Sequence, residues 1–295
     1  MNKEVEQQYV NVPSELKNLW AVEMDILLKF AEICEKHHLK WFAGGGTLLG
    51  AVRHRGFIPW DDDIDIAMPY EDYVKICDLA SEFEEPYFLQ TWKTQDGWSP
   101  YMCKLRRSDT TGHTGREGKY PRFWNKGVFI DIVAVCNFPD NKLVAGIQLL
   151  LLKTIRALYC GYEAKRDGVL AADNKFLDKL LKNSYSAISI ICNYKHLSDI
   201  YVKIGGWQKK NSKLCGPLLF EPWRKELIFR SEWFKDLVML DFMDMSIPCP
   251  SGYDSRLTAQ YGEYMKPVKA PNYHGDLNVD LKHSYKELLY DTNME

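Results

Sequence analysis

Four aspartates stand within five positions in the segment PWDDDIDIAMP, residues 59–69. Clustered carboxylates repel one another unless a cation lies between them. Two aspartates spaced as D-x-D on a strand point to the same side, and their oxygens are ligands that Mg2+ prefers, with Mn2+ as the alternative ion. The run holds two such pairs, Asp61/Asp63 and Asp63/Asp65. We favour Asp63 and Asp65 as the metal ligands, because the isoleucines that alternate with them would anchor this pair against the core.

A third carboxylate is expected to complete the set. Asp131 lies inside the apolar run GVFIDIVAV (127–135), which predicts a buried strand. A lone buried carboxylate is costly unless it is paired or bound to a metal. Two interpretations therefore stay open for Asp131: a third metal ligand, or a structural aspartate held by backbone amides or by an arginine.

A glycine turn precedes the acidic run in AGGGTLLG, residues 43–50. The segment LKWFA before it predicts a short strand, and TLLGAVRHR predicts a short helix that begins at Thr47. Backbone amides at a helix N-terminus favour an anion, and glycine lets the backbone come close to that anion. We therefore predict that Gly45, Gly46 and Thr47 bind a phosphate; an ordinary tight turn is the alternative.

Basic residues near these elements are candidates for holding a diphosphate. Arg53 either contacts the substrate or neutralises the aspartates. With Asp63 and Asp65 as the metal ligands, Asp62 is expected to point away from the metal, toward Arg53 or Arg55. Lys104 and Arg106 alternate with apolar residues along a predicted strand, so they share one face of it. Two cations on a strand beside the acidic one form a candidate phosphate clamp.

The elements around these residues predict an α/β fold. Apolar residues at spacings of three and four predict a long helix that starts at Ser14, which can cap it. The same patterns predict helices at 70–83, 141–163 and 173–193, strands at 63–68, 87–91, 101–107 and 127–135, further strand character at 226–249, and loops at 108–126 and 205–217. This order predicts a catalytic core over 1–136, a mainly helical insertion over 137–220, and a C-terminal segment over 221–295 that returns to the core.

The composition narrows the classes of protein. The chain has 295 residues, 46% of them hydrophobic, and a formal net charge of -2, which predicts a globular protein and disfavours general nucleic-acid binding. None of the eight cysteines forms a C-x-x-C pair, so we expect reduced thiols in a cytoplasmic protein.

The longest apolar run, LVAGIQLLLL at 143–152, is about half the length of a membrane span. A buried helix is the favoured interpretation of this run. Because Lys153, Arg156, Lys165 and Arg166 follow it, a helix at the inner surface of the membrane is the alternative. We therefore expect at most peripheral membrane contact, and the sequence does not define the oligomeric state.

The glycine turn and the acidic run together, GGGTLLGAVRHRGFIPWDDDIDIAMPYEDY, closely resemble the central motif of the LicD family. Members of that family include bacterial phosphocholine transferases, and fukutin-related proteins share a more distant form. The resemblance continues in KLRRSDTT (104–111), GVFIDIVAV (127–135) and IPCPSGYDSRLTAQYGEYMKP (247–267). It implies a nucleotidyltransferase-type mixed sheet with flanking helices and a helical insertion.

The resemblance also implies a function. A LicD-like enzyme would use Mg2+ to transfer a phosphorylated alcohol from a CDP-activated donor to a sugar hydroxyl. Phosphocholine, carried by CDP-choline, is the leading candidate for the transferred group. The acceptor would be a cell-surface glycan or its precursor, such as lipopolysaccharide or teichoic acid. In this scheme Asp131 binds metal or takes the proton of the acceptor hydroxyl. The alternatives are a true nucleotidyltransferase, which leaves the nucleotide on the acceptor, and an inactive glycan-binding protein.

Overall fold

The computed structural model describes residues 9–115, 117, 124–167, 194–208, 212–219, 225–268 and 277–287, with only the backbone of residues 160, 161 and 163–167. The predicted helix at 173–193 lies outside these residues.

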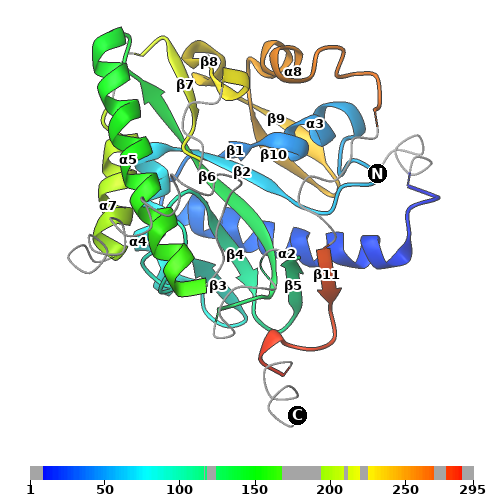
Figure 1. Cartoon of the computed structure of the whole chain (residues 1–295). Helices are drawn as coiled ribbons and strands as arrows, with labels where there is room; N and C mark the ends of the chain where they lie inside the picture. The colour runs from blue at the N-terminus through cyan, green and yellow to red at the C-terminus, as the bar shows by residue number, and fades with distance from the viewer. Residues whose placement is uncertain are drawn as a thin grey trace.

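A mixed sheet forms the centre of the molecule (Figure 1). Its strands follow the order β1 (Phe42–Ala43), β2 (Asp65–Pro69), β6 (Val128–Phe138), β4 (Cys103–Arg107) and β3 (Tyr87–Gln90). Strands β2 and β6 are parallel, and the other pairs along this path are antiparallel. The last part of β6 pairs with β7 (Leu214–Pro217), which in turn pairs with β8 (Phe229–Arg230). The predicted α/β class is confirmed.

Strand β6 carries the register that builds the site. Most of its apolar residues are buried, and Ile130 and Ile132 have no exposed surface. Between them, Asp131 pairs across the sheet with Asp65 on β2 and with Lys104 on β4. Asp65, Asp131 and Lys104 are therefore side by side on three neighbouring strands.

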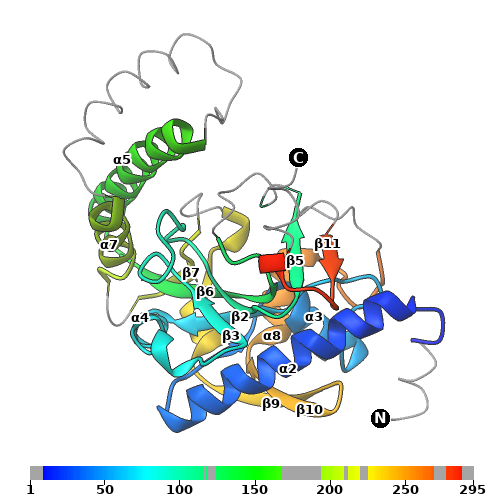
Figure 2. The same ribbon diagram turned by 90° about the horizontal axis from the view of Figure 1, so that it is seen from below.

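Helices cover the sheet and lead into the site. Helix α2 (Ser14–Lys36) packs against β4 and β6 and crosses the face of the sheet that Figure 2 shows. The predicted cap at Ser14 is wrong, because the helix begins at Ser14 with Pro13 in the N-cap position, and the Ser14 hydroxyl donates to Glu15 instead. Helix α3 (Gly45–His54) begins two residues before the predicted Thr47. Helix α4 (Tyr70–Asp78) and the 3-10 turn η1 (Ala80–Glu82) follow β2.

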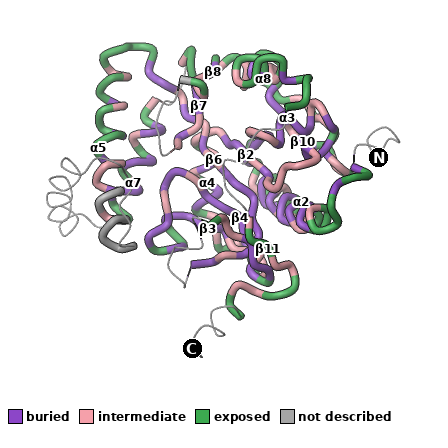
Figure 3. Tube along the Cα trace, turned by 45° about the vertical axis from the view of Figure 1, so that its right-hand side comes forward, coloured by how far each residue is buried: buried purple, intermediate pink, exposed green. Residues whose placement is uncertain are grey.

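Helices α5 (Lys142–Asp167) and α7 (Tyr194–Gly205) pack against each other beside the sheet (Figure 1). Helix α5 buries only one side of the predicted apolar run: Leu152 is fully buried, but Leu143 is 74% exposed (Figure 3). Among the residues described, no helix is both long and apolar enough to span a bilayer. Strand β7 lies inside the predicted loop at 205–217 and belongs to the central sheet, so residues 214–217 form a strand and not a loop.

The C-terminal segment lies against the first half of the chain. After the short turns η3 (Lys225–Leu227) and η4 (Ser231–Phe234), β9 (Leu237–Phe242) and β10 (Met245–Pro250) form a hairpin that contacts α3 and β1. Helix α8 (Tyr253–Tyr261) follows. Strand β11 (Leu277–Asp280) pairs with β5 (Thr111–Thr114), so part of the predicted loop at 108–126 is a strand that finds its partner far along the chain. The predicted division into three parts stays a prediction.

The six cysteines in the described part of the chain are buried and form no disulfide, as the sequence predicted.

Candidate active site

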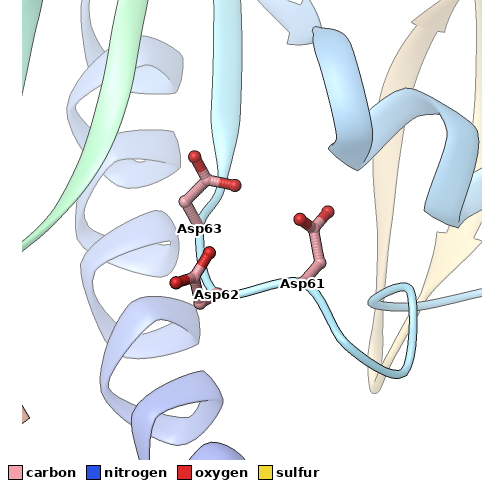
Figure 4. A group of neighbouring side chains, drawn as sticks. All are labelled: Asp61, Asp62 and Asp63. Carbon is pink, nitrogen blue, oxygen red and sulfur yellow. The ribbon is translucent and has the colours of Figure 1, made fainter. Parts of the chain in front are cut away.

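The aspartates that the sequence singled out meet at the start of β2. Asp63, Asp65 and Asp131 each place a carboxylate oxygen within 4.8 Å of the others. Asp61, Asp62 and Asp63 satisfy the same limit, so Asp63 belongs to both groups, and Figure 4 shows these three side chains on the segment that leads into β2 beside α2. The prediction that Asp62 points away is wrong, because its carboxylate lies within 4.8 Å of the carboxylates of Asp61 and Asp63.

Burial and mutual repulsion disfavour negative charge in this group. Burial, followed by the charges of Asp65 and Asp62, raises the pKa of Asp61 to about 7. Burial, followed by Asp65 and Asp61, raises the pKa of Asp63 well above its usual value. A bound cation would reverse both effects, since opposite charge favours the ionised carboxylate.

Glu23 joins the acidic group from helix α2. The residue is 1% exposed, and burial, followed by the charges of Asp63 and Asp62, raises the pKa of its carboxyl group well above the usual value. Our sequence analysis missed Glu23. A signal was present, because Glu23 follows Trp20 by three residues and precedes Leu27 by four, which places an acid on the apolar face of the helix.

The donor set fits Mg2+ in its chemistry. All the groups are carboxylate oxygens, which hard cations prefer over nitrogen or sulfur. Beside them lies a cavity of about 20 Å³ lined by seven residues, Asp62, Asp63, Lys104, Thr114, Phe129, Asp131 and Leu277. This volume holds about one water-sized particle. Asp63, Asp65 and Asp131 would hold the ion, which stays a prediction.

Lys104 is placed beside the acidic group, as the strand pattern predicted. Its ammonium nitrogen lies 2.8 Å from Oδ1 of Asp131 and 3.4 Å from Oε1 of Glu117, over the ring of Phe129. Burial alone would raise the pKa of Glu117. The charges of Lys104 and Arg106 outweigh this effect and lower the pKa to about 2. Lys104 therefore holds Asp131 in place, and its charge is already balanced by two carboxylates.

Arg106 shares the face of Lys104 but does not reach the substrate side. It is 1% exposed, its Nε donates to Gln90, its Nη1 donates to the carbonyl of Gly127, and its Nη2 donates to Glu117. A phosphate clamp at Arg106 is therefore contradicted. The alternation of side chains along β4 correctly places Lys104 and Arg106 on one face, but it does not show that Glu117 covers that face. Arg106 therefore holds Glu117 in position, and Glu117 in turn pairs with Lys104.

The glycine turn holds Asp65. The amide of Gly44 donates to the Asp65 carbonyl at 2.9 Å, and the amide of Gly46 donates to Oδ2 of Asp65 at 3.2 Å. The Asp65 amide donates to Oγ1 of Thr47 at 2.8 Å, and Thr47 is 3% exposed. Thr47 thus anchors the start of β2 and does not line the substrate pocket described below, which corrects its predicted role.

A pocket of about 670 Å³ opens beside the aspartates. That volume lies in the range of small-molecule sites. Arg53 lines it, with Nη1 donating to the carbonyl of Tyr264 at 2.7 Å. The other lining residues include the three glycines, four aspartates and several aromatic side chains: Gly44, Gly45, Gly46, Asp61, Asp62, Asp63, Asp65, Phe42, Trp60, Phe229, Phe234, Tyr261 and Tyr264. The pocket thus has both charged and aromatic residues in its lining.

A glycine turn that meets clustered carboxylates at one edge of a mixed sheet is typical of nucleotidyltransferase-type proteins. Residues 38–131 match the family described as LicD/FKTN/FKRP, nucleotidyltransferase domain. The chain is 28% identical to the lipopolysaccharide cholinephosphotransferase LicD of Haemophilus influenzae over 85% of this chain and 91% of that protein. It is 44% identical to an uncharacterized protein of Rickettsia prowazekii over 18% of this chain and 20% of that protein. The resemblance to the LicD family is thus supported by the domain match over residues 38–131 and by the similarity to this cholinephosphotransferase over most of the chain.

The raised pKa values predict how stability depends on pH without metal. The pKa of Asp61 is about 4 in the unfolded chain and about 7 in the folded one, so the folded state holds the extra proton. The free energy of unfolding should therefore fall as pH rises from about 4 to about 7. We expect Tm in EDTA to be lower at pH 8 than at pH 5, and Mg2+ to reduce that difference.

Thermal unfolding of the wild type, Asp61→Asn and Asp244→Asn checks this. Asp244 lies in the β9–β10 turn, is exposed, and serves as the matched control. Asp61→Asn should flatten the dependence and Asp244→Asn should not. Identical pH profiles for all three proteins in EDTA would show that the charge of Asp61 does not limit stability.

Proposed function

We propose that this protein transfers phosphocholine from CDP-choline to a sugar hydroxyl of lipopolysaccharide or a related cell-surface glycan. The observation that carries the proposal is the meeting of Asp63, Asp65 and Asp131, of which Asp63 and Asp65 line a pocket large enough for a nucleotide conjugate. The similarity to a lipopolysaccharide cholinephosphotransferase, which extends over 91% of that relative, supports the same choice of substrates.

The chain's own groups would position the donor and acceptor. Asp63 and Asp65 would hold Mg2+, which when bound supplies positive charge to the donor diphosphate. The backbone at Gly45 and Gly46 lines the pocket close to these carboxylates and would approach the phosphate oxygens. Arg53 lines the same pocket and would add positive charge there. The aromatic residues of the lining are suited to stacking the cytosine ring or to contacting the choline cation.

Asp131 would act on the acceptor. Lys104 holds its Oδ1 at 2.8 Å, which leaves the second carboxylate oxygen for the metal or for the proton of the sugar hydroxyl. In the reaction the sugar oxygen forms a bond to the phosphorus that carries choline. The bond from that phosphorus to the oxygen of CMP breaks, and CMP leaves with the electron pair.

The products test the proposal. Enzyme incubated with CDP-choline, Mg2+ and a lipopolysaccharide acceptor should release one CMP for each phosphocholine that the acceptor gains, measured by chromatography and mass spectrometry. Parallel reactions with CDP-ethanolamine and CDP-glycerol show which phosphorylated alcohol the enzyme transfers. An acceptor that gains a cytidine monophosphate group while free phosphocholine is released would establish true nucleotidyl transfer instead. Absence of turnover with every CDP-alcohol, together with glycan binding, would favour an inactive glycan-binding protein.

A further inference from the structure

The pocket contains a buried guanidinium group that the sequence analysis did not assign. Arg256 lies on helix α8, is 7% exposed and lines the same pocket as the glycine turn and the aspartates. Its Nε and Nη1 atoms are buried and have no hydrogen-bond partner among the described residues. The rings of Phe229 and Phe234 lie 5.2 and 5.7 Å from its Cζ atom.

Such an arrangement is costly for folding alone. A buried charged donor without a partner loses its hydration and gains no hydrogen bond in return. Aromatic contacts compensate a cation only in part. Within the described chain, no carboxylate lies within 4.0 Å of the Arg256 nitrogens. The group is therefore held ready for an anion that enters the pocket.

Three other cations near the site, Lys104, Arg106 and Arg53, are already engaged. Lys104 is paired with Asp131 and Glu117, and Arg106 donates to Glu117 and to backbone carbonyls. Arg53 donates to the carbonyl of Tyr264. Arg256 differs from these three, because two of its donor atoms have no acceptor in the part of the chain that the structure describes.

We propose that Arg256 binds phosphate oxygens of the CDP-activated donor in the pocket that it lines together with Asp63 and Asp65. The identity of this donor rests on the function proposed above, but the inference that an oxyanion binds here does not. A planar guanidinium can give two parallel hydrogen bonds to a phosphate, which lysine cannot reproduce. Helix α8 thus contributes a substrate-binding residue from the C-terminal segment, which replaces the clamp that the sequence suggested at Arg106.

Calorimetric titration of three variants tests the proposal with two probes, CDP-choline and inorganic pyrophosphate, both with Mg2+. Arg256→Gln should weaken the binding of both probes about 10- to 100-fold, since it removes charged hydrogen bonds. Arg256→Lys should fall between the glutamine variant and the wild type. Arg230→Gln is the matched control, because Arg230 is exposed on β8 and pairs with Glu232, and it should bind like the wild type.

Binding of cytidine distinguishes a phosphate-binding role of Arg256 from a purely structural one. Cytidine lacks phosphate, so its affinity should be the same for the wild type and for Arg256→Gln. Equal weakening of cytidine and CDP-choline binding would overturn the proposal in favour of a packing role. If Arg256→Gln does not fold, the same comparison is made with Arg256→Lys, which keeps the charge.

The outcomes separate this inference from the proposed function. A wild type that transfers phosphocholine, with an Arg256→Gln variant that binds CDP-choline and pyrophosphate normally, refutes the role of Arg256 alone. A wild type without turnover on any CDP-alcohol, but with pyrophosphate binding that depends on Arg256, refutes the function and supports the anion site. A wild type that binds neither probe overturns the anion site.

Discussion

Asp63→Asn is expected to lower turnover by about 10³-fold or more, because metal-mediated charge stabilisation supplies several kcal/mol and each 1.4 kcal/mol is a factor of ten. Asp63 belongs to both groups of carboxylates at the start of β2. Burial and its acidic neighbours already raise its pKa, so the neutral amide should be well tolerated in the absence of metal. We therefore expect Tm in EDTA to equal or exceed that of the wild type, and the gain in Tm on adding Mg2+ to be largely lost.

The measurement combines CMP release with thermal unfolding across a Mg2+ titration. Asp244→Asn makes the same chemical change on an exposed turn and should leave both readouts unchanged. A folded Asp63→Asn protein with near-normal CMP release would remove Asp63 from the metal site.

Two further substitutions decide which D-x-D pair binds the ion. If Asp63 and Asp65 are the ligands, Asp65→Asn should match Asp63→Asn, while Asp61→Asn should retain most of the Mg2+-dependent gain in Tm. The reverse order would assign the ion to Asp61 and Asp63. The register of β2 beside β6 favours the first outcome, since it places Asp65 next to Asp131.

The sequence predicted the sheet and its acidic row because both depend on local patterns. The apolar run around Asp131 could only be a buried strand, and alternation along β2 and β4 fixed which side chains share a face. The register then brought Asp65, Asp131 and Lys104 into one row.

The remaining features depend on contacts between distant segments, which local patterns do not encode. Arg106 was misassigned because alternation gives the face of a strand but not what covers it, and Glu117 covers it. The role of Arg256 depends on α8 reaching the pocket after more than a hundred intervening residues. Strand β5 was predicted as loop because it pairs only with β11, near the end of the described chain.

The glycine turn shows how closely the backbone and the aspartates fit. Gly45 has a φ of +27°, and a Cβ atom there would lie 2.0 Å from Oδ2 of Asp65. A Cβ atom on Gly46 would lie 2.5 Å from Oδ2 of Asp61. Glycine is therefore required at both positions to leave room for the carboxylates of Asp65 and Asp61. That the same glycines bind a phosphate stays a prediction.

Gly45→Ala is expected to lower turnover about 10²-fold, because a displacement of about 1 Å at a reacting group has an effect of that size. The methyl group must push the Asp65 carboxylate away from the amide of Gly46, and the positive φ adds strain of about 1–3 kcal/mol to the folded state. Gly46→Ala should disturb Asp61 instead, so comparing the two variants reports which carboxylate turnover requires. Gly146→Ala is the control, because a Cβ atom there meets nothing within 4 Å. Steady-state CMP release and Mg2+-dependent Tm measure the effects, and a folded Gly45→Ala enzyme with unchanged kcat and unchanged Mg2+ dependence would show that the position of Asp65 is not critical.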